Sequence, residues 1–149
     1  NKIHAKILPD SGMKSFENSI DKSGLNIKFL NKKTKFEEAI KSYNLAVNFR
    51  MSTVFFECLI QNKPTILVLD KRTNIYFDKK FLNFLKLMLK NNIAFINISK
   101  ASKFINENYF HLDKWWNNKK TQNLRNDIRE NYCRNFNSTH KDFKKLFND

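Results

Sequence analysis

Polar and apolar residues alternate along the first part of the chain, which is the pattern of strands that bury one face. By this pattern and by short apolar runs, strands are predicted at residues 2–8, 25–30, 44–49, 65–70 and 93–98. The segment at 65–70, TILVLD, contains a continuous apolar run, ILVL. Such a run favours a strand that is buried on both faces, as in a parallel sheet.

Segments with apolar residues at helical spacing separate these predicted strands. Ser52 or Thr53 is expected to cap a helix that follows the third strand, because hydroxyl side chains accept hydrogen bonds from the first amides of a helix. A longer helix is expected from about residue 78 to 91. Ser99 or Ser102 is expected to cap the helix that follows the fifth strand.

Strands that alternate with helices at this spacing are typical of βαβ units. We therefore predict a single α/β domain over residues 1–149, with a Rossmann-like parallel sheet of about five strands flanked by helices. The α/β core is expected to extend to about residue 110, and residues 111–149 are expected to form a helical tail. The chain begins with Asn1 rather than Met, so we expect a fragment of a longer protein.

The chain is strongly basic, with 28 Lys and Arg against 14 Asp and Glu and a net charge of +14. Nucleic acid is nevertheless the less favoured partner, because Lys outnumbers Arg 23 to 5 and base recognition in a groove favours the Arg guanidinium. Contact with an anionic membrane or a phosphorylated substrate suits the charge better. The alternative function is a non-catalytic basic module that binds nucleic acid or an anionic membrane surface.

Several site classes are excluded or disfavoured by residue counts. The only glycines, Gly12 and Gly24, cannot supply the glycine-rich phosphate loops of nucleotide-binding motifs.

Cys58 and Cys133 are isolated, which is typical of thiols in a reducing compartment. No apolar run resembles a signal peptide or a membrane span. A cytoplasmic location is expected, with peripheral association with the inner membrane left open.

The most informative segment joins the predicted third strand to the next helix. Ser52 and Thr53 stand at the helix start, where free amides and the helix dipole favour an anion. Arg50 could clamp a phosphate, and Glu57, one turn into the helix, could accept hydrogen bonds from a ribose diol. The same residues also fit an ordinary capped helix in which Glu57 balances the dipole.

Four further charged residues lie at the ends of predicted strands or just after them and could line the same crevice. Lys6 lies near the end of the first strand, and Asp70, Lys71 and Arg72 follow the fourth. Ligands bind outside the carboxyl ends of the strands in open α/β sheets, so Lys6 is a candidate for phosphate contact and the other three residues could line the crevice. A surface lysine and a solvated Asp-Lys-Arg turn are the alternatives.

Catalytic and metal-binding residues are not recognisable. The three histidines have no acid or nucleophile at a recognisable spacing, and the carboxylates form no evident pair. No metal site and no cofactor are predicted. Trp115 and Trp116 are expected to hold the helical tail on the sheet, with stacking on a sugar or base as the alternative.

Three segments together resemble known sequences. Residues 44–66 resemble the donor-binding signature of GT-B glycosyltransferases, with a strand, a Ser/Thr-rich helix start, a Glu and then a Pro before the next strand. The chain more specifically resembles a family of bacterial surface-carbohydrate transferases, from about residue 3 to 135. The matching segments are Lys6-Ile7-Leu8-Pro9, Arg50 to Glu57, and Trp115-Trp116-Asn117 with the following Gln122.

This resemblance implies the C-terminal, donor-binding half of a GT-B enzyme that uses a nucleotide-sugar. It implies phosphate contacts for Ser52 and Thr53, a ribose or sugar contact for Glu57, and a diphosphate contact for Lys6. An N-terminal domain outside this chain would bind the glycan or lipid-linked acceptor and supply the base. Arg50 and Met51 stand where the family has Tyr and Asn, and Val54 replaces a Thr. The loss of the Asn and the Thr removes polar contacts, which leaves the donor's identity open.

Overall fold

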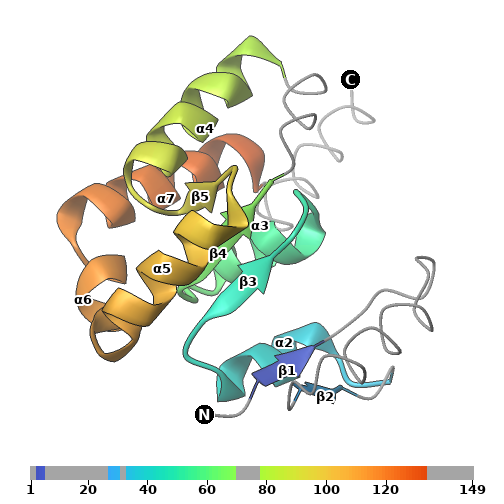
Figure 1. Ribbon diagram of the computed structural model, residues 1–149. Coiled ribbons are helices and arrows are strands. Elements are labelled where there is room, and N and C mark those ends of the chain that lie inside the picture. Colours follow the sequence, from blue (N-terminus) through green and yellow to red (C-terminus); the bar gives the residue numbers. More distant parts are fainter. Residues whose placement is uncertain (1–2, 6–26, 31–32, 70–77, 134–149) are drawn as a thin grey trace, which may run out of the picture. The chain divides into compact units, whose positions relative to one another are not determined.

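The computed structural model describes residues 3–5, 27–30, 33–69 and 78–133 (Figure 1). The chain divides into two compact units, residues 1–39 and 40–149, and each is described by itself. Four of the predicted site residues lie outside the described residues: Lys6, Asp70, Lys71 and Arg72. That residues 1–149 form one domain stays a prediction.

The first unit contains two short parallel strands and one short helix. β1 (Ile3–Ala5) pairs with β2 (Ile27–Phe29), with Ile3 opposite Ile27. α2 (Phe36–Ala39) follows, with two acidic residues in its only turn. Both strands lie inside segments in which alternation predicted a strand.

The second unit contains a three-stranded parallel sheet in the order β3-β4-β5. Its strands are β3 (Ala46–Asn48), β4 (Thr65–Val68) and β5 (Ala94–Phe95). All four residues of the central β4 are buried, so the prediction of a strand covered on both faces is confirmed.

The prediction of one sheet of about five strands was wrong, because the strands of the described residues form a parallel pair and a separate sheet of three. Alternation of polar and apolar residues fixes which side of a strand faces a core. It does not determine which strand lies beside it, since pairing depends on contacts that are distant in the sequence. The α/β class and the parallel pairing are nevertheless as predicted.

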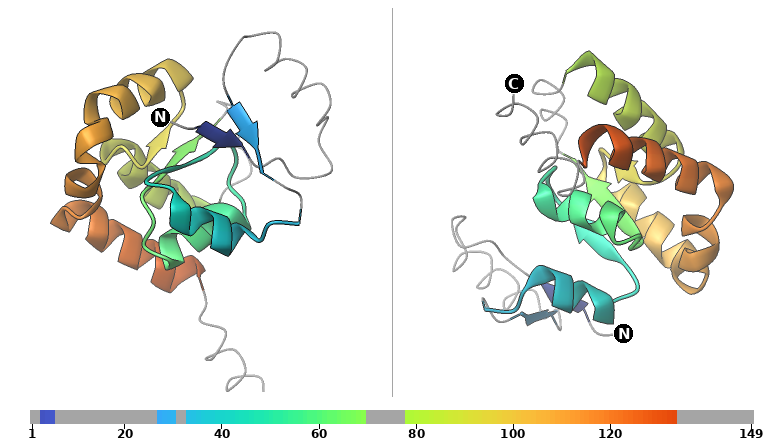
Figure 2. Two further views of the ribbon diagram at one scale, coloured as in Figure 1. Left: turned by 90° about the horizontal axis from the view of Figure 1, so that it is seen from below. Right: turned by 180° about the vertical axis from the view of Figure 1, so that it is seen from behind.

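Helices cover both faces of the three-stranded sheet. α3 (Thr53–Ile60), α4 (Lys79–Lys90) and α7 (Lys119–Tyr132) pack on one face, as the view from behind shows (Figure 2). α5 (Ile98–Asn108) packs on the other face, where Ala101 joins Ile66, Val68 and Phe95. The remaining short elements are η1 (Ile40–Ser42), η3 (Tyr109–His111) and α6 (Leu112–Trp116).

The larger core lies between the sheet and the helices α3, α4 and α7. Phe55 and Leu59 from α3 belong to the same core cluster as Leu67 of β4, and all three side chains are fully buried. Leu124 and Ile128 add the apolar stripe of α7, and Tyr132 packs against the same cluster. The prediction of a helical tail is confirmed for α6 and α7, up to Tyr132.

The segment 93–98 forms less strand than predicted. β5 ends at Phe95, and α5 already begins at Ile98 with Asn97 as its N-cap. The Asn97 side chain accepts a hydrogen bond from the Lys100 amide at 3.1 Å, so the expectation of a Ser99 or Ser102 cap was wrong. Asn is as good an N-cap residue as Ser. The segment 93–98 was assigned to a strand because of its apolar residues, so the helix start at Asn97 was not recognised.

Two helices end in the same way, each with an Asn in the left-handed conformation. Asn62 after α3 has φ 53°, and Asn92 after α4 has φ 58°. The next amides reach back five residues, Lys63 to Cys58 at 2.8 Å and Ile93 to Met88 at 2.9 Å. These are Schellman motifs, which turn the chain sharply from the helix into β4 and β5. None of the helices in the described ranges is long and apolar enough to cross a membrane.

Candidate functional site

The candidate site begins where β3 ends. The strand stops at Asn48 and α3 starts at Thr53, so Arg50 and Ser52 lie in the short connection at the carboxyl end of the sheet. Ligands of open parallel sheets bind outside this end of the strands. The structure therefore places these two predicted residues where the fold itself favours a ligand.

The start of α3 differs from the starts of the other long helices in its capping. Ser52 is the N-cap with an extended backbone, but its hydroxyl makes no capping hydrogen bond. Side chains at the equivalent positions of α4, α5 and α7 each accept a hydrogen bond from an amide of the first turn; these are Asp78, Asn97 and Asn118. The first hydrogen bond of α3 runs from the Phe55 amide to the Ser52 carbonyl at 3.0 Å. The Ser52 hydroxyl therefore takes no part in capping α3.

The remaining predicted groups lie along the first turns of the same helix. Thr53 is exposed, and Glu57 is half-buried four residues later. Side chains four residues apart lie on one face of a helix, so these two groups are neighbours along α3. Arg50 is exposed just before the helix. Two hydroxyls, a guanidinium and a carboxylate thus lie within eight residues at the carboxyl end of β3.

A cluster of buried polar side chains joins β3 to β4 beside this connection. The sequence pattern did not identify these residues. The Asn48 side chain donates a hydrogen bond to the Thr65 hydroxyl at 2.9 Å. Thr65 is fully buried on β4 and donates to the carbonyl of Ala46 at 3.4 Å. The bond between Asn48 and Thr65 ties the last residue of β3 to the first residue of β4. An amide in an otherwise apolar strand was the signal that could have identified Asn48.

Cys58 belongs to the same cluster and is not suited to act as a nucleophile. Burial raises the pKa of its thiol, and hydrogen bonds with Thr65 and Asn48 only partly oppose this effect. The neighbouring carboxylate of Glu57 raises the pKa of this thiol further. Because the thiolate is the reactive form, this buried thiol has a structural role.

The other end of α3 is held by the helical tail. Trp116 is buried, and its indole N–H donates to the carbonyl of Asn62 at 3.1 Å and to the side-chain oxygen of Asn62 at 2.9 Å. The side-chain amide of Gln122 donates to the same side-chain oxygen of Asn62 at 3.2 Å and to the Trp116 carbonyl at 2.8 Å. The prediction that the tryptophans hold the tail on the core is thereby confirmed for Trp116.

Arg125 of α7 also holds the end of α3, and the sequence pattern did not identify it as a buried residue. Its side chain is 7% exposed, and its Nε donates to the Leu59 carbonyl at 2.8 Å near the end of α3. One terminal nitrogen donates to Gln122 at 3.0 Å and to Asn126 at 3.1 Å. Desolvation lowers the pKa of this guanidinium, and the nearby charge of Arg129 lowers it further. A cation at a helix C-terminus interacts favourably with the helix dipole, whose positive end lies at Ser52.

Comparison with known proteins adds one finding. A family model described as LIC12162 family transferase matches residues 2–147. The chain belongs to the LIC12162 family of transferases. A search of curated proteins and a search of solved structures each gave no match.

The match covers both compact units, so the pair β1-β2 and the three-stranded sheet are both part of the LIC12162 family sequence. Within the described residues, the structure brings together Ser52, Thr53 and Glu57 on α3, with Arg50 just before the helix. It places His111 on the surface in η3. No group of three or more His, Cys, Asp or Glu side chains that could hold a metal ion occurs in the described part of the chain.

Proposed function

We propose that this chain is the donor-binding half of a glycosyltransferase that transfers a sugar from a nucleotide-sugar to a bacterial surface polysaccharide. Membership of a transferase family supports group transfer in general. The observation that carries the finer proposal is the start of α3, where the Ser52 hydroxyl makes no capping bond at the carboxyl end of β3. A hydroxyl in this place can donate to a phosphate oxygen while the helix dipole favours the negative charge.

The proposed mechanism requires stabilisation of the leaving nucleoside diphosphate. As the bond from the sugar to the diphosphate breaks, negative charge develops on the diphosphate oxygens. The hydroxyls of Ser52 and Thr53 and the positive end of α3 would stabilise that charge, and Arg50 would add a bidentate contact. Glu57 would accept hydrogen bonds from the ribose or the sugar.

The proposal extends to groups outside the described residues and outside this chain. Lys6, Asp70, Lys71 and Arg72 would line the donor crevice, as their positions near the ends of predicted strands suggest. The acceptor, a glycan or a lipid-linked glycan, and the general base would belong to an N-terminal domain. The proposed location is cytoplasmic, with peripheral association with the inner membrane. No cofactor is part of the proposal.

Binding of nucleotides can be tested directly with the chain as it is. Thermal unfolding would be recorded with UDP, GDP, CDP, CMP and their sugars at moderate salt. A ligand present at 100 times its dissociation constant adds about 2.7 kcal/mol of stability. We expect one nucleotide class to raise the melting temperature and the others to leave it unchanged.

Variants of the site decide whether such binding uses α3. Ser52→Ala and Arg50→Glu should weaken nucleotide binding, because each removes a donor to the phosphates. The matched controls are Ser99→Ala in the first turn of α5 and Lys86→Glu on the exposed side of α4. Unchanged affinity in both site variants would refute the proposed role of α3.

The alternative function has a different signature in the same experiment. A basic module that binds nucleic acid or an anionic membrane should respond to single-stranded DNA or anionic vesicles and not to mononucleotides. Its affinity should fall by orders of magnitude over a few-fold rise in salt. A mononucleotide held by a few contacts should lose much less affinity.

A further inference from the structure

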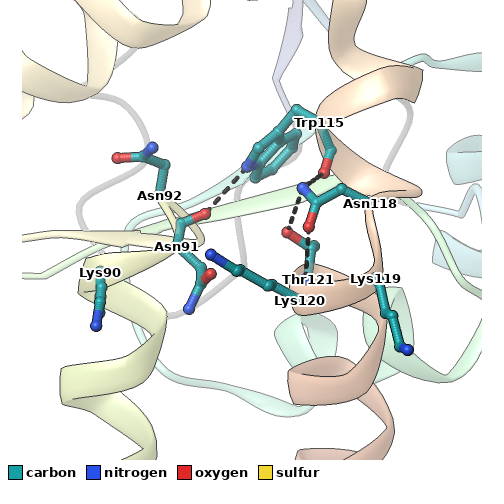
Figure 3. A pocket seen from close by; sticks show the side chains of 8 residues that line it. All are labelled: Lys90, Asn91, Asn92, Trp115, Asn118, Lys119, Lys120 and Thr121. Atoms are coloured by element: carbon teal, nitrogen blue, oxygen red, sulfur yellow. Dashed lines mark hydrogen bonds between the residues drawn. The ribbon is translucent and has the colours of Figure 1, made fainter.

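A pocket of about 470 Å³ lies where the end of α4 approaches the start of α7 (Figure 3). Its wall includes Lys90 and Asn91 from the end of α4, Trp115 from α6, and Asn118, Lys119 and Lys120 from the start of α7. The turn after α4 leads into β5, so the pocket lies toward the amino ends of the strands. The donor site proposed above lies at the carboxyl ends, so the two sites are separate.

Three lysines line this pocket, and the residues that line it include no Asp or Glu. Lys120 extends across the opening toward Asn91, and Lys90 and Lys119 flank it on either side (Figure 3). All three lysine side chains are exposed. Positive charges of this kind repel one another, and an anion placed among them would relieve the repulsion.

The wall of the pocket is formed in advance by hydrogen bonds. The indole N–H of Trp115 donates to the Asn91 carbonyl at 3.0 Å, which joins α6 to the turn after α4. The Asn118 side chain donates to the carbonyl of Trp115 and to the Thr121 hydroxyl, and it accepts from the Thr121 amide at 2.9 Å. A ligand would therefore not need to order this wall, which lowers the free-energy cost of binding.

We propose that this pocket binds a diphosphate group, as a second anion site at the amino end of the sheet. Lysine ammonium groups bind phosphates as mobile point charges, and three of them match the several charges of a diphosphate. The volume lies within the usual range for small-ligand sites, about 300–1,000 Å³. Such a group could be free in solution or carried by a lipid, and the chemistry of recognition would be the same.

The two adjacent tryptophans provide the test and its internal control. The indole N–H signals of Trp115 and Trp116 can be followed by ¹⁵N NMR while inorganic pyrophosphate is added at constant ionic strength. Trp115 lines the pocket, whereas Trp116 bonds to Asn62 at the end of α3. We expect the Trp115 signal to shift in a saturable way and the Trp116 signal to stay in place. Trp115→Phe assigns the two signals.

Charge variants distinguish a site from general attraction to a basic protein. The triple variant Lys90→Gln, Lys119→Gln, Lys120→Gln should weaken pyrophosphate binding by about tenfold or more. A control with the same loss of charge replaces three exposed lysines elsewhere on the same unit, Lys86, Lys100 and Lys114. It should change the affinity by less than about twofold.

Two further experiments test whether this pocket acts independently of the donor site and whether the diphosphate is free or carried by a lipid. Ser52→Ala should leave the response of Trp115 unchanged, because Ser52 lies at the other end of the strands. Sedimentation with phosphatidylcholine vesicles that contain farnesyl diphosphate tests a lipid-borne source. Binding to either probe that depends on the three pocket lysines supports the site. A response to neither probe, or equal losses in the pocket and control variants, would overturn it.

Discussion

Trp116 binds both oxygen atoms of Asn62, a residue 54 positions earlier in the chain. The neighbouring Trp115 makes the corresponding bond to Asn91, in the turn after α4. Each tryptophan thus binds the chain just after a different core helix, where it turns into β4 or β5. The pair therefore fixes two successive helix-to-strand turns with one short segment of the tail.

Replacing Trp116 with Phe should lower the free energy of unfolding by about 3 kcal/mol. The smaller ring leaves a cavity in the core, and both Asn62 oxygens lose the indole donor. Urea unfolding followed by circular dichroism measures the loss. Trp115→Phe is the matched control and should cost about half as much, because Trp115 is half-buried and makes one bond. An equal or larger loss at Trp115 would contradict this ranking.

Arg125→Met should destabilise the chain by about 2 kcal/mol. Methionine keeps much of the apolar stem but leaves the buried Leu59 carbonyl without the Nε donor. Arg129→Met, one turn later on α7, serves as the control and should cost less than about 0.5 kcal/mol. Equal unfolding free energies for the two variants would show that the bond from Arg125 to Leu59 contributes little to stability.

The sequence predicted the position of strands far better than their partners. The apolar run TILV at 65–68 identified the buried β4, and alternation identified β1 and β2. Which strands share a sheet depends on hydrogen bonds between distant segments, and the local pattern contains no information about them. One sheet of about five strands was therefore predicted where the strands of the described residues form two sheets.

The candidate site was predictable in part. The hydroxyl pair after a predicted strand, Ser52 and Thr53, located the start of α3, where Ser52 is the N-cap. The capping hydrogen bond expected for the hydroxyl is absent. The groups that support the helix were not found, because Asn48 and Arg125 are polar residues that become buried only through distant partners. Polar residues are usually exposed, so a sequence pattern assigns them to the surface by default.

The raised pKa of Cys58 makes stability depend on pH in the alkaline range. Above the ordinary thiol pKa of 9.0, the unfolded chain loses this proton while the folded chain keeps it. The unfolded state then binds fewer protons, so the free energy of unfolding falls as pH rises, by at most about 1.4 kcal/mol per pH unit from this group. Below pH 9.0, this stabilising contribution is fully present.

Urea unfolding between pH 7 and the alkaline range checks this dependence in a Cys133→Ala background. That background removes the second thiol, whose pKa burial also raises. Adding Cys58→Ala should flatten the alkaline decline in stability relative to the background chain. Tyr132 also has a raised pKa and contributes equally to both chains. Parallel pH profiles for the two chains would show that Cys58 has the same pKa folded and unfolded.

Ser52→Ala should have almost no effect on folding, although Ser52 occupies the N-cap of a core helix. Its hydroxyl makes no capping bond, so the expected cost is below about 0.5 kcal/mol. Asp78→Ala at the N-cap of α4 is the comparison, because its carboxylate accepts from the Phe81 amide at 2.7 Å. That variant should lose about 1 kcal/mol. A loss at Ser52 as large as the loss at Asp78 would mean that its hydroxyl serves the helix, and the proposed phosphate contact would then lose its support.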